Sequence, residues 1–194
     1  MSSVAADIGA VILAAGRGRR IGEPKALLPL HGSTFLEHIV NTIRSAGITD
    51  IAAVVSDPLY ERVAKTLPDC AVVVNPNPDG DMLSSVRIGL KNSDVVRGVF
   101  IVPVDHPFVE VNTYRRLMTA LTEYPNHVVI PEYNGSGGHP ILVPSSFTKI
   151  LHSMRTVSAL NRAIKESGLE IVRTPVNDAG ILKNVNTAQD LEDV

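Results

Sequence analysis

"IGAVILA", residues 8–14, is a continuous apolar run that leads into a glycine-rich turn. A run that is apolar at every position is typical of a strand buried on both faces. Four further runs of this kind occur at 51–55, 71–74, 99–104 and 128–130. These runs predict a mostly parallel sheet that is covered on both sides.

Helical patterns lie between the apolar runs. The clearest begins with Thr34 and Glu37 as a capping box, carries apolar residues three and four apart, and ends at Gly47. Two more have the same apolar spacing, at 114–121 and 147–154. The alternation predicts a three-layer α/β/α fold with a Rossmann-like sheet, whose ligands bind beyond the carboxyl ends of the strands.

Length and charge narrow the class of protein. A chain of 194 residues predicts a single domain, 1–194, and a net charge of −2 gives no overall field to attract nucleic acid or an anionic membrane. The single cysteine, Cys70, excludes an internal disulfide framework and suits a reducing compartment. We therefore expect a cytoplasmic protein without nucleic-acid or membrane partners, and one sequence leaves open whether it forms a homo-oligomer.

Cations gather in one segment, "LAAGRGRRIGEPKALLPL", residues 13–30. A dinucleotide fingerprint would need a third glycine three residues after Gly18, and Pro24 interrupts any helix that follows. The P-loop pattern also fails, because Lys25 follows a proline and precedes no Ser or Thr. What remains is a loop in which Gly16 and Gly18 let the backbone approach an anion, while Arg20 and Lys25 supply charge. A triphosphate is long enough to use all of these groups.

This segment resembles the nucleotidyltransferases that activate sugars, isoprenoid precursors and molybdenum cofactor, whose pattern runs LAAG, GxR, a hydrophobic-Gly step and PK. It is most similar to the molybdopterin cytidylyltransferase branch of the MobA-like NTP transferases, and the resemblance extends to about Leu191. The resemblance implies the sheet of the nucleotide-diphospho-sugar transferases, called GT-A-like. It also implies that Arg20 holds the β- and γ-phosphates, that Lys25 contacts the α-phosphate, and that the base and ribose lie against Leu13, Ala14, Ala15 and Gly16.

"VPVDHPFV", residues 102–109, places Asp105 directly after an apolar run. A carboxylate near a triphosphate is the expected ligand of Mg²⁺, which binds through one or two protein oxygens together with phosphates. The segment is similar to the Asp-x-Pro metal motif of the family. The alternative is that Asp105 caps the turn before Pro107.

Two other segments resemble ligand-binding elements of the family. "NPNPDGDMLSSVRIGL", residues 75–90, enters a helix near Ser84 and Ser85; it resembles a Gly-Met-Ser-Ser-Ser-Leu-Arg element that recognises the nucleotide, although Ser84 could simply be an N-cap. "NGSGGHPILV", residues 134–143, is a glycine-rich loop before a strand-like run. It matches an element that borders the acceptor pocket, which would make Gly138, His139 and Pro140 substrate contacts.

"NVNTAQDL", residues 184–191, provides the second candidate metal ligand, Asn186. The cytidylyl branch has Asp-x-Asp-Thr here, and the Asn-x-Asn-Thr of this chain is more like the guanylyltransferases of the same pathway. An amide oxygen can ligate Mg²⁺ without adding negative charge. Alternatively, Asn186 or Thr187 caps a C-terminal helix.

Together these features predict an enzyme, a Mg²⁺-dependent nucleotidyltransferase with Lys25, Arg20 and Asp105 as catalytic residues. We expect it to transfer a nucleoside monophosphate from an NTP, with CTP favoured, to a phosphorylated acceptor, with molybdopterin favoured by the resemblance, and to release pyrophosphate. A Gly-Asp-x-Gly-Ala-Arg segment of the cytidylyl branch is missing, which favours a sugar- or polyol-phosphate cytidylyl- or uridylyltransferase as the alternative. Two other classes stay open: a non-catalytic nucleotide- or cofactor-binding protein, and a dinucleotide-dependent oxidoreductase that would use Asp57.

Overall fold

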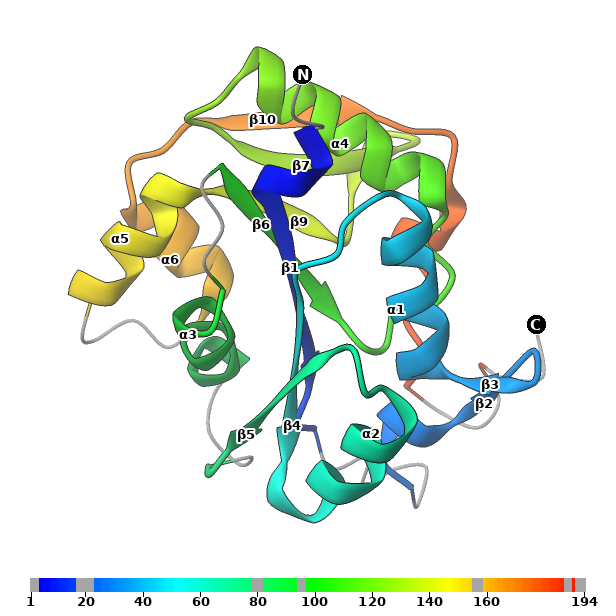
Figure 1. Cartoon of the computed structure of the whole chain (residues 1–194). Coiled ribbons are helices and arrows are strands. Elements are labelled where there is room, and N and C mark those ends of the chain that lie inside the picture. The colour runs from blue at the N-terminus through cyan, green and yellow to red at the C-terminus, as the bar shows by residue number, and fades with distance from the viewer. Residues whose placement is uncertain are drawn as a thin grey trace.

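The first apolar run forms β1 (Ile8–Ala14), which lies at the centre of the main sheet in the computed structural model (Figure 1). All seven of its residues are buried, as a strand covered on both faces requires. β1 pairs in parallel with β4 (Ile51–Ser56) on one side and with β6 (Gly98–Pro103) on the other. The structure describes residues 4–16, 23–77, 82–93, 97–154, 159–186 and 190.

The sheet continues outward from β1 in the order β10-β7-β9-β6-β1-β4-β5, with a short β8 paired to β7. Its other strands are β5 (Ala71–Asn75), β7 (Val128–Tyr133), β8 (Ser136–Gly137), β9 (Ile141–Pro144) and β10 (Ile171–Pro175). The pairs β4–β5 and β7–β10 are also parallel, whereas β9 is antiparallel to both of its neighbours. The prediction of a mostly parallel sheet is therefore confirmed.

Helices cover both faces of the sheet (Figure 1). Alternate β1 residues face the two layers, since Val11 and Leu13 pack into one apolar cluster and Ala10 and Ile12 into the other. The first layer contains α3 (Met82–Lys91), α5 (Ser145–Ser153) and α6 (Leu160–Glu166), and the second contains α1 (Phe35–Ser45), α2 (Tyr60–Thr66) and α4 (Val111–Glu123). This arrangement confirms the three-layer α/β/α prediction.

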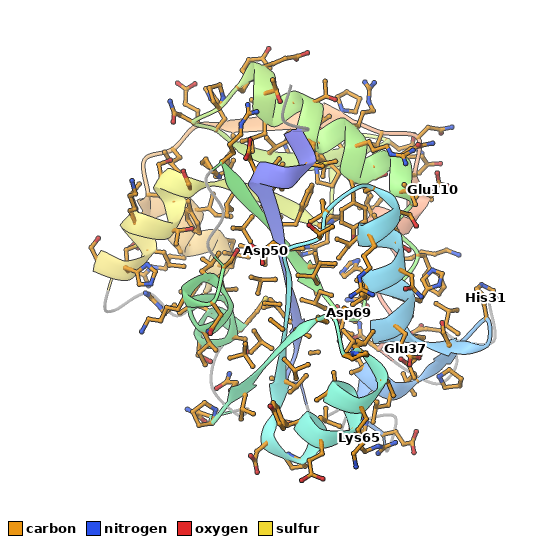
Figure 2. All side chains as sticks on the ribbon, viewed as in Figure 1. His31, Glu37, Asp50, Lys65, Asp69 and Glu110 are labelled. Atoms are coloured by element: carbon orange, nitrogen blue, oxygen red, sulfur yellow. The ribbon has the colours of Figure 1, made fainter. Side chains whose placement is uncertain are left out.

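The segment between Lys25 and α1 is held by local hydrogen bonds. Lys25 begins a 3-10 turn, η2 (Lys25–Leu27), and a hairpin of β2 (Pro29–Leu30) and β3 (Ser33–Thr34) leads from it to α1. The predicted capping box is present: the Thr34 hydroxyl accepts from the Glu37 backbone, and the Glu37 carboxylate accepts from the Thr34 backbone N–H. Figure 2 shows Glu37 in the first turn of α1. The cap fixes where α1 begins.

The carboxyl ends of β1 and β6 lie side by side, because the two strands are parallel neighbours. The chain leaves β1 at Ala15 and Gly16, and it leaves β6 at Val104 and Asp105. Three more 3-10 turns complete the described elements: η1 (Val4–Asp7), η3 (Asp57–Leu59) and η4 (Ala179–Ile181). Among the described helices, none is both long and apolar enough to cross a membrane.

Candidate functional site

Lys25, Asp105 and Asn186, which are far apart in the sequence, meet at the carboxyl end of the sheet. The Lys25 ammonium Nζ lies 3.1 Å from Asp105 Oδ2 and 2.7 Å from Asn186 Oδ1. The side chains of Lys25 and Asp105 are 18% and 25% exposed, so a ligand in solution can still reach them. Because one ammonium donates to both oxygens, these three groups form one centre, which we call the Lys25 centre.

Asp105 is placed by the backbone around it. It follows β6 directly, and the Val104 N–H donates to the Leu13 carbonyl at 3.2 Å, which joins the end of β6 to the end of β1. The Asp105 carbonyl accepts from the Val185 N–H at 2.8 Å. The carboxylate faces Lys25, and among the described residues it accepts no hydrogen bond from the backbone of the next turn, so the structure does not support the alternative that it caps this turn.

A segment near the C-terminus, residues 176–186, carries Asn186 to this centre, and we call it the strap. Its anchor is the buried Asp178 carboxylate, which accepts from the Glu110 N–H at 2.9 Å and from the Thr113 hydroxyl at 2.6 Å. The same carboxylate accepts from the Gly180 N–H at 2.8 Å. Figure 2 shows Glu110 close to the start of α4, where backbone N–H groups need an acceptor.

The strap packs so closely that two glycines have no space for a side chain. A Cβ at Gly180 would lie 2.1 Å from the Phe108 carbonyl oxygen, and a Cβ at Gly138 would lie 2.3 Å from the Ile181 carbonyl oxygen. At its end, the Asn186 N–H donates to the Asp190 carboxylate at 2.7 Å, and the Asn186 side-chain amide donates to Asn184. The strap is therefore held along its length by close backbone packing, and Asn186 at its end is held by the Asp190 and Asn184 side chains.

The predicted acceptor element, residues 138–140, reaches the Lys25 centre through His106, a residue that was not predicted from the sequence. The His139 N–H donates to the Ile181 carbonyl at 3.0 Å, and the Gly138 N–H donates to the Pro131 carbonyl at 3.0 Å. The His139 ring lies against the ring of His106, with 4.9 Å between their centroids. His106 Nε2 is 3.9 Å from Asp105 Oδ1, so His106 lies between Asp105 and the 138–140 element.

Both imidazoles are neutral at pH 7. Burial, together with the nearby His106, lowers the pKa of His139 to about 4, against a smaller opposing effect of Asp105. Burial also lowers the pKa of His106, and the Lys25 charge lowers it further, while Asp105 opposes this. A group with a pKa near 4 is a poor proton acceptor at neutral pH, so His139 is better suited to contact a ligand than to act as a general base.

Ser84 and Ser85 belong to a separate cluster at the end of β5. The buried Asn75 amide donates to the Ser84 hydroxyl at 3.0 Å and to the Ser85 hydroxyl at 2.9 Å, and its oxygen accepts from the Asn77 N–H. The N-cap alternative for Ser84 is wrong, because α3 begins at Met82 and places Ser84 inside its first turn. The start of α3 lies beyond the carboxyl end of β5, at the same edge of the sheet as the Lys25 centre.

The predicted glycine-rich loop is described only in part. Leu13 and Ala14 end β1, Ala15 is buried and Gly16 is exposed, whereas Gly18 and Arg20 lie outside the described residues, as does Thr187. A Cβ added at Gly16 would meet none of the described residues within 4 Å. The protein itself therefore does not require a glycine at this position for space.

The donor set of the Lys25 centre fits a hard divalent cation. A carboxylate and an amide oxygen already face one positive charge there, and oxygen ligands are those that Mg²⁺ prefers. Within the part of the chain that the structure describes, no group of three or more His, Cys, Asp or Glu side chains could hold a metal by itself. A cation at this centre would thus need further oxygens from a ligand.

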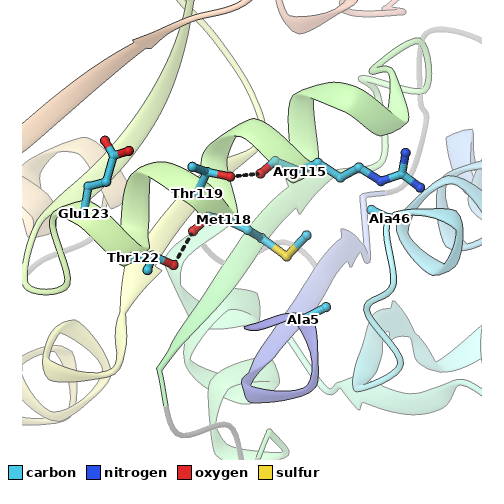
Figure 3. A pocket seen from close by; sticks show the side chains of 7 residues that line it. All are labelled: Ala5, Ala46, Arg115, Met118, Thr119, Thr122 and Glu123. Carbon is cyan, nitrogen blue, oxygen red and sulfur yellow. Dashed lines mark hydrogen bonds between the residues drawn. The ribbon is translucent and has the colours of Figure 1, made fainter. Parts of the chain in front are cut away.

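A cavity of about 480 Å³ lies elsewhere, against the second half of α4 (Figure 3). Its lining includes Ala5, which precedes β1, and Met118 on α4. Ala5 marks the amino end of the central strand, whereas the Lys25 centre lies at the carboxyl end. The cavity is therefore separate from the candidate site.

Three further residues of the site were missed from the sequence: His106, Asn75 and Asp178. His106 stands inside the quoted "VPVDHPFV" segment, so its position at a strand end was a usable signal. Asn75 acts through the hydroxyls of Ser84 and Ser85, and Asp178 acts through two backbone N–H groups and the distant Thr113 hydroxyl. Such contacts leave no local pattern.

Comparison with protein families gives one match over most of the chain. A family model described as the MobA-like NTP transferase domain matches residues 10–172. A probable molybdenum cofactor guanylyltransferase of Rhodopirellula baltica is 27% identical over 191 residues, covering 93% of this chain and 88% of that protein. The nicotine blue oxidoreductase of Paenarthrobacter nicotinovorans is 29% identical over 142 residues, or 69% of each chain.

Solved structures share the fold. Rv0371c of Mycobacterium tuberculosis has a TM-score of 0.82 at 23% identity over 97% of both chains. The structure of the same protein in complex with manganese has a TM-score of 0.77 and covers 96% of this chain and 97% of that one. A nucleotidyl transferase of Methanothermobacter has a TM-score of 0.79 at 25% identity, covering 96% of this chain and 94% of that one.

Proposed function

This chain belongs to the MobA-like NTP transferase family, and we propose that it transfers the nucleoside monophosphate of GTP to a phosphorylated acceptor of the molybdopterin type, releasing pyrophosphate. Nucleotidyl transfer is the activity of the family. The identity of the donor base, the acceptor and the metal are the parts that we propose.

The convergence of Lys25, Asp105 and Asn186 carries the proposal. These residues come from the end of the glycine-rich loop, from the end of β6 and from the strap, and they bring one ammonium group and two oxygen ligands together. Transfer at a phosphorus atom needs aligned anions and neutralised charge more than it needs covalent chemistry. The centre offers what such a reaction requires.

In the proposed reaction, the Lys25 ammonium neutralises charge on the α-phosphoryl group, and Arg20 holds the outer phosphates. The oxygens of a phosphate monoester are largely ionised at neutral pH, since their second pKa is about 6, so the acceptor needs no general base. The neutral His106 and His139 fit that requirement, because they would contact the acceptor without taking its proton. A divalent cation held by Asp105 and Asn186 would supply further neutralisation of phosphate charge.

Two observations favour GTP over the CTP that the sequence analysis expected. Curated relatives are named molybdenum cofactor guanylyltransferases, the Rhodopirellula protein among them. The Asn184-x-Asn186 pair also departs from the Asp-x-Asp of the cytidylyl branch. CTP stays a prediction and is the first competitor to test. For the metal we propose Mg²⁺; the manganese complex of the Mycobacterium structure supports a divalent ion of this class.

A matrix of pyrophosphate-release assays tests the proposal. The four NTPs are paired with molybdopterin and with a panel of sugar and polyol phosphates, each with Mg²⁺ and with Mn²⁺. We expect the highest kcat/KM with GTP and molybdopterin. Turnover with a sugar or polyol phosphate would favour the alternative acceptor class. If the protein binds an NTP but no combination of NTP and acceptor gives turnover, a non-catalytic protein would be favoured.

One relative keeps the oxidoreductase alternative open. The Paenarthrobacter protein is named an oxidoreductase, and Asp57 follows β4, where a ribose-binding acid would be expected. However, Asp57 is exposed within a short 3-10 turn that includes Pro58. Titration of the protein with NADH and NADPH, followed by nicotinamide fluorescence, decides this: binding near the micromolar range would favour the oxidoreductase over the transferase.

A further inference from the structure

The Lys25 ammonium stands where a metal ion would be expected to stand. Its Nζ is the shared partner of Asp105 Oδ2 and Asn186 Oδ1, at 3.1 Å and 2.7 Å. Within the part of the chain that the structure describes, the Asp105 carboxylate and the Asn186 amide are the groups at this centre that offer oxygens to a divalent cation. Two positive charges this close together would repel strongly in a partly buried site. Lys25 and a metal ion therefore compete for the same pair of oxygens.

The oxygens are held more firmly than the ammonium. Asp105 is fixed through its carbonyl by the Val185 N–H, and Asn186 is fixed by its backbone bond to Asp190 and by its side-chain bond to Asn184. The Lys25 backbone is tied in the η2 turn, where the Leu28 N–H donates to its carbonyl at 3.2 Å. Its ammonium ends a flexible four-carbon stem, and its side-chain partners among the described residues are the same two oxygens that a metal would take. When the charges rearrange, the ammonium is the group that moves.

We propose that Lys25 occupies the metal position in the nucleotide-free protein, and that it leaves when an NTP arrives with its divalent cation. The phosphates draw the ammonium toward themselves, and the cation takes its place on Asp105 and Asn186. Metal binding and the contact of Lys25 with phosphate are then a single coupled event. Without nucleotide, the protein binds the metal weakly at this centre; with NTP bound, the metal position becomes available. This inference rests on the proposed function only in taking Asp105 and Asn186 as the oxygens that face the metal.

Titration of the protein with Mn²⁺, without nucleotide or acceptor, tests the proposal. The EPR signal of hexaaqua Mn²⁺ measures the free ion, so the dissociation constant is obtained without any enzyme activity. Lys25→Met removes the ammonium and keeps the apolar stem, and we expect it to bind Mn²⁺ at least tenfold more tightly than wild type. Lys25→Arg keeps a cation and should bind Mn²⁺ as weakly as wild type does.

Two controls locate the effect. Lys65→Met removes an exposed lysine of α2 and should leave Mn²⁺ binding unchanged. Lys25→Met combined with Asp105→Asn should lose the gain, because the carboxylate that holds the metal is gone. If Lys25→Met does not fold, as judged by its circular dichroism spectrum, Lys25→Gln removes the same charge while retaining an amide that can donate to the oxygens.

Mn²⁺ affinity that is unchanged or lower in both neutral variants would overturn the proposal, as would a gain that survives loss of the Asp105 charge. The result is independent of turnover. A wild type that is inactive in every well of the assay matrix would count against the proposed function, whereas a Mn²⁺ constant insensitive to Lys25 would count against this inference alone.

Discussion

Replacing Asp178 tests whether the strap is held as the structure indicates. Its carboxylate is 4% exposed and accepts from three donors: the Glu110 N–H, the Thr113 hydroxyl and the Gly180 N–H. A buried donor left without an acceptor costs about 1–3 kcal/mol, and some of the three will find water once the carboxylate is gone. We therefore expect Asp178→Ala to lower the free energy of unfolding by about 3–5 kcal/mol.

Urea denaturation followed by circular dichroism measures this change. Asp178→Asn keeps one acceptor oxygen and should cost less, about 1–2 kcal/mol. Asp69→Ala removes an exposed aspartate and should stay within about 0.5 kcal/mol of wild type. At a temperature where Asp178→Asn is folded, its kcat/KM should fall roughly tenfold or more, because the strap positions Asn186. A cost below about 1 kcal/mol for Asp178→Ala would refute the role of the three hydrogen bonds.

Two further predictions concern the crevice. Gly16→Ala should leave the melting temperature unchanged, because its Cβ would meet none of the described residues within 4 Å. It should raise the KM for NTP at least tenfold if the nucleotide approaches this backbone, and an unchanged KM would show that it does not. The pKa of His139 is about 4 when folded and near 6.5 when unfolded, so as pH falls through this window the unfolded chain gains a proton that the folded protein lacks. The free energy of unfolding should thus fall by up to about 3 kcal/mol between pH 7 and pH 4, and His139→Gln should reduce this slope in urea titrations at several pH values; an unchanged slope would contradict the assignment.

The layered fold was predictable because most of its strands are continuous apolar runs in the sequence. Continuous apolar runs marked β1, β4, β5, β6 and β7, and the capping box marked the start of α1. β5 carries an apolar run but lies at the sheet edge with most of its residues not buried, so the prediction of burial on both faces is wrong for this strand. β10, at the other edge, was missed because Arg173 and Thr174 interrupt its apolar run. The antiparallel direction of β9 could not be predicted from its own residues, since direction depends on the path of the chain around it.

The site was predictable where chemistry requires a particular side chain. Lys25 and Asp105 stood at strand ends or in the glycine-rich loop, and a cation and a carboxylate there have few other uses. The contact of His106 with His139 depends on how β6 and the 138–140 element meet across the sheet. The anchoring of the strap by Asp178 depends on the backbone N–H groups of Glu110 and Gly180, which almost any residue type supplies, and on the Thr113 hydroxyl, which lies 65 residues away in the sequence. Positions that act through such contacts become visible only in the folded chain.

The central claim is that the Lys25 centre performs nucleotidyl transfer. Its most direct test is the rate of pyrophosphate release by Lys25→Ala and Asp105→Ala with saturating NTP, acceptor and divalent metal. Lys65→Ala, on the exposed surface of α2 (Figure 2), and Asp69→Ala serve as matched controls for the loss of the same charges. We predict that both site variants fold but release pyrophosphate at least roughly a hundredfold more slowly, while the controls match wild type. Near-normal rates in both site variants would contradict the account.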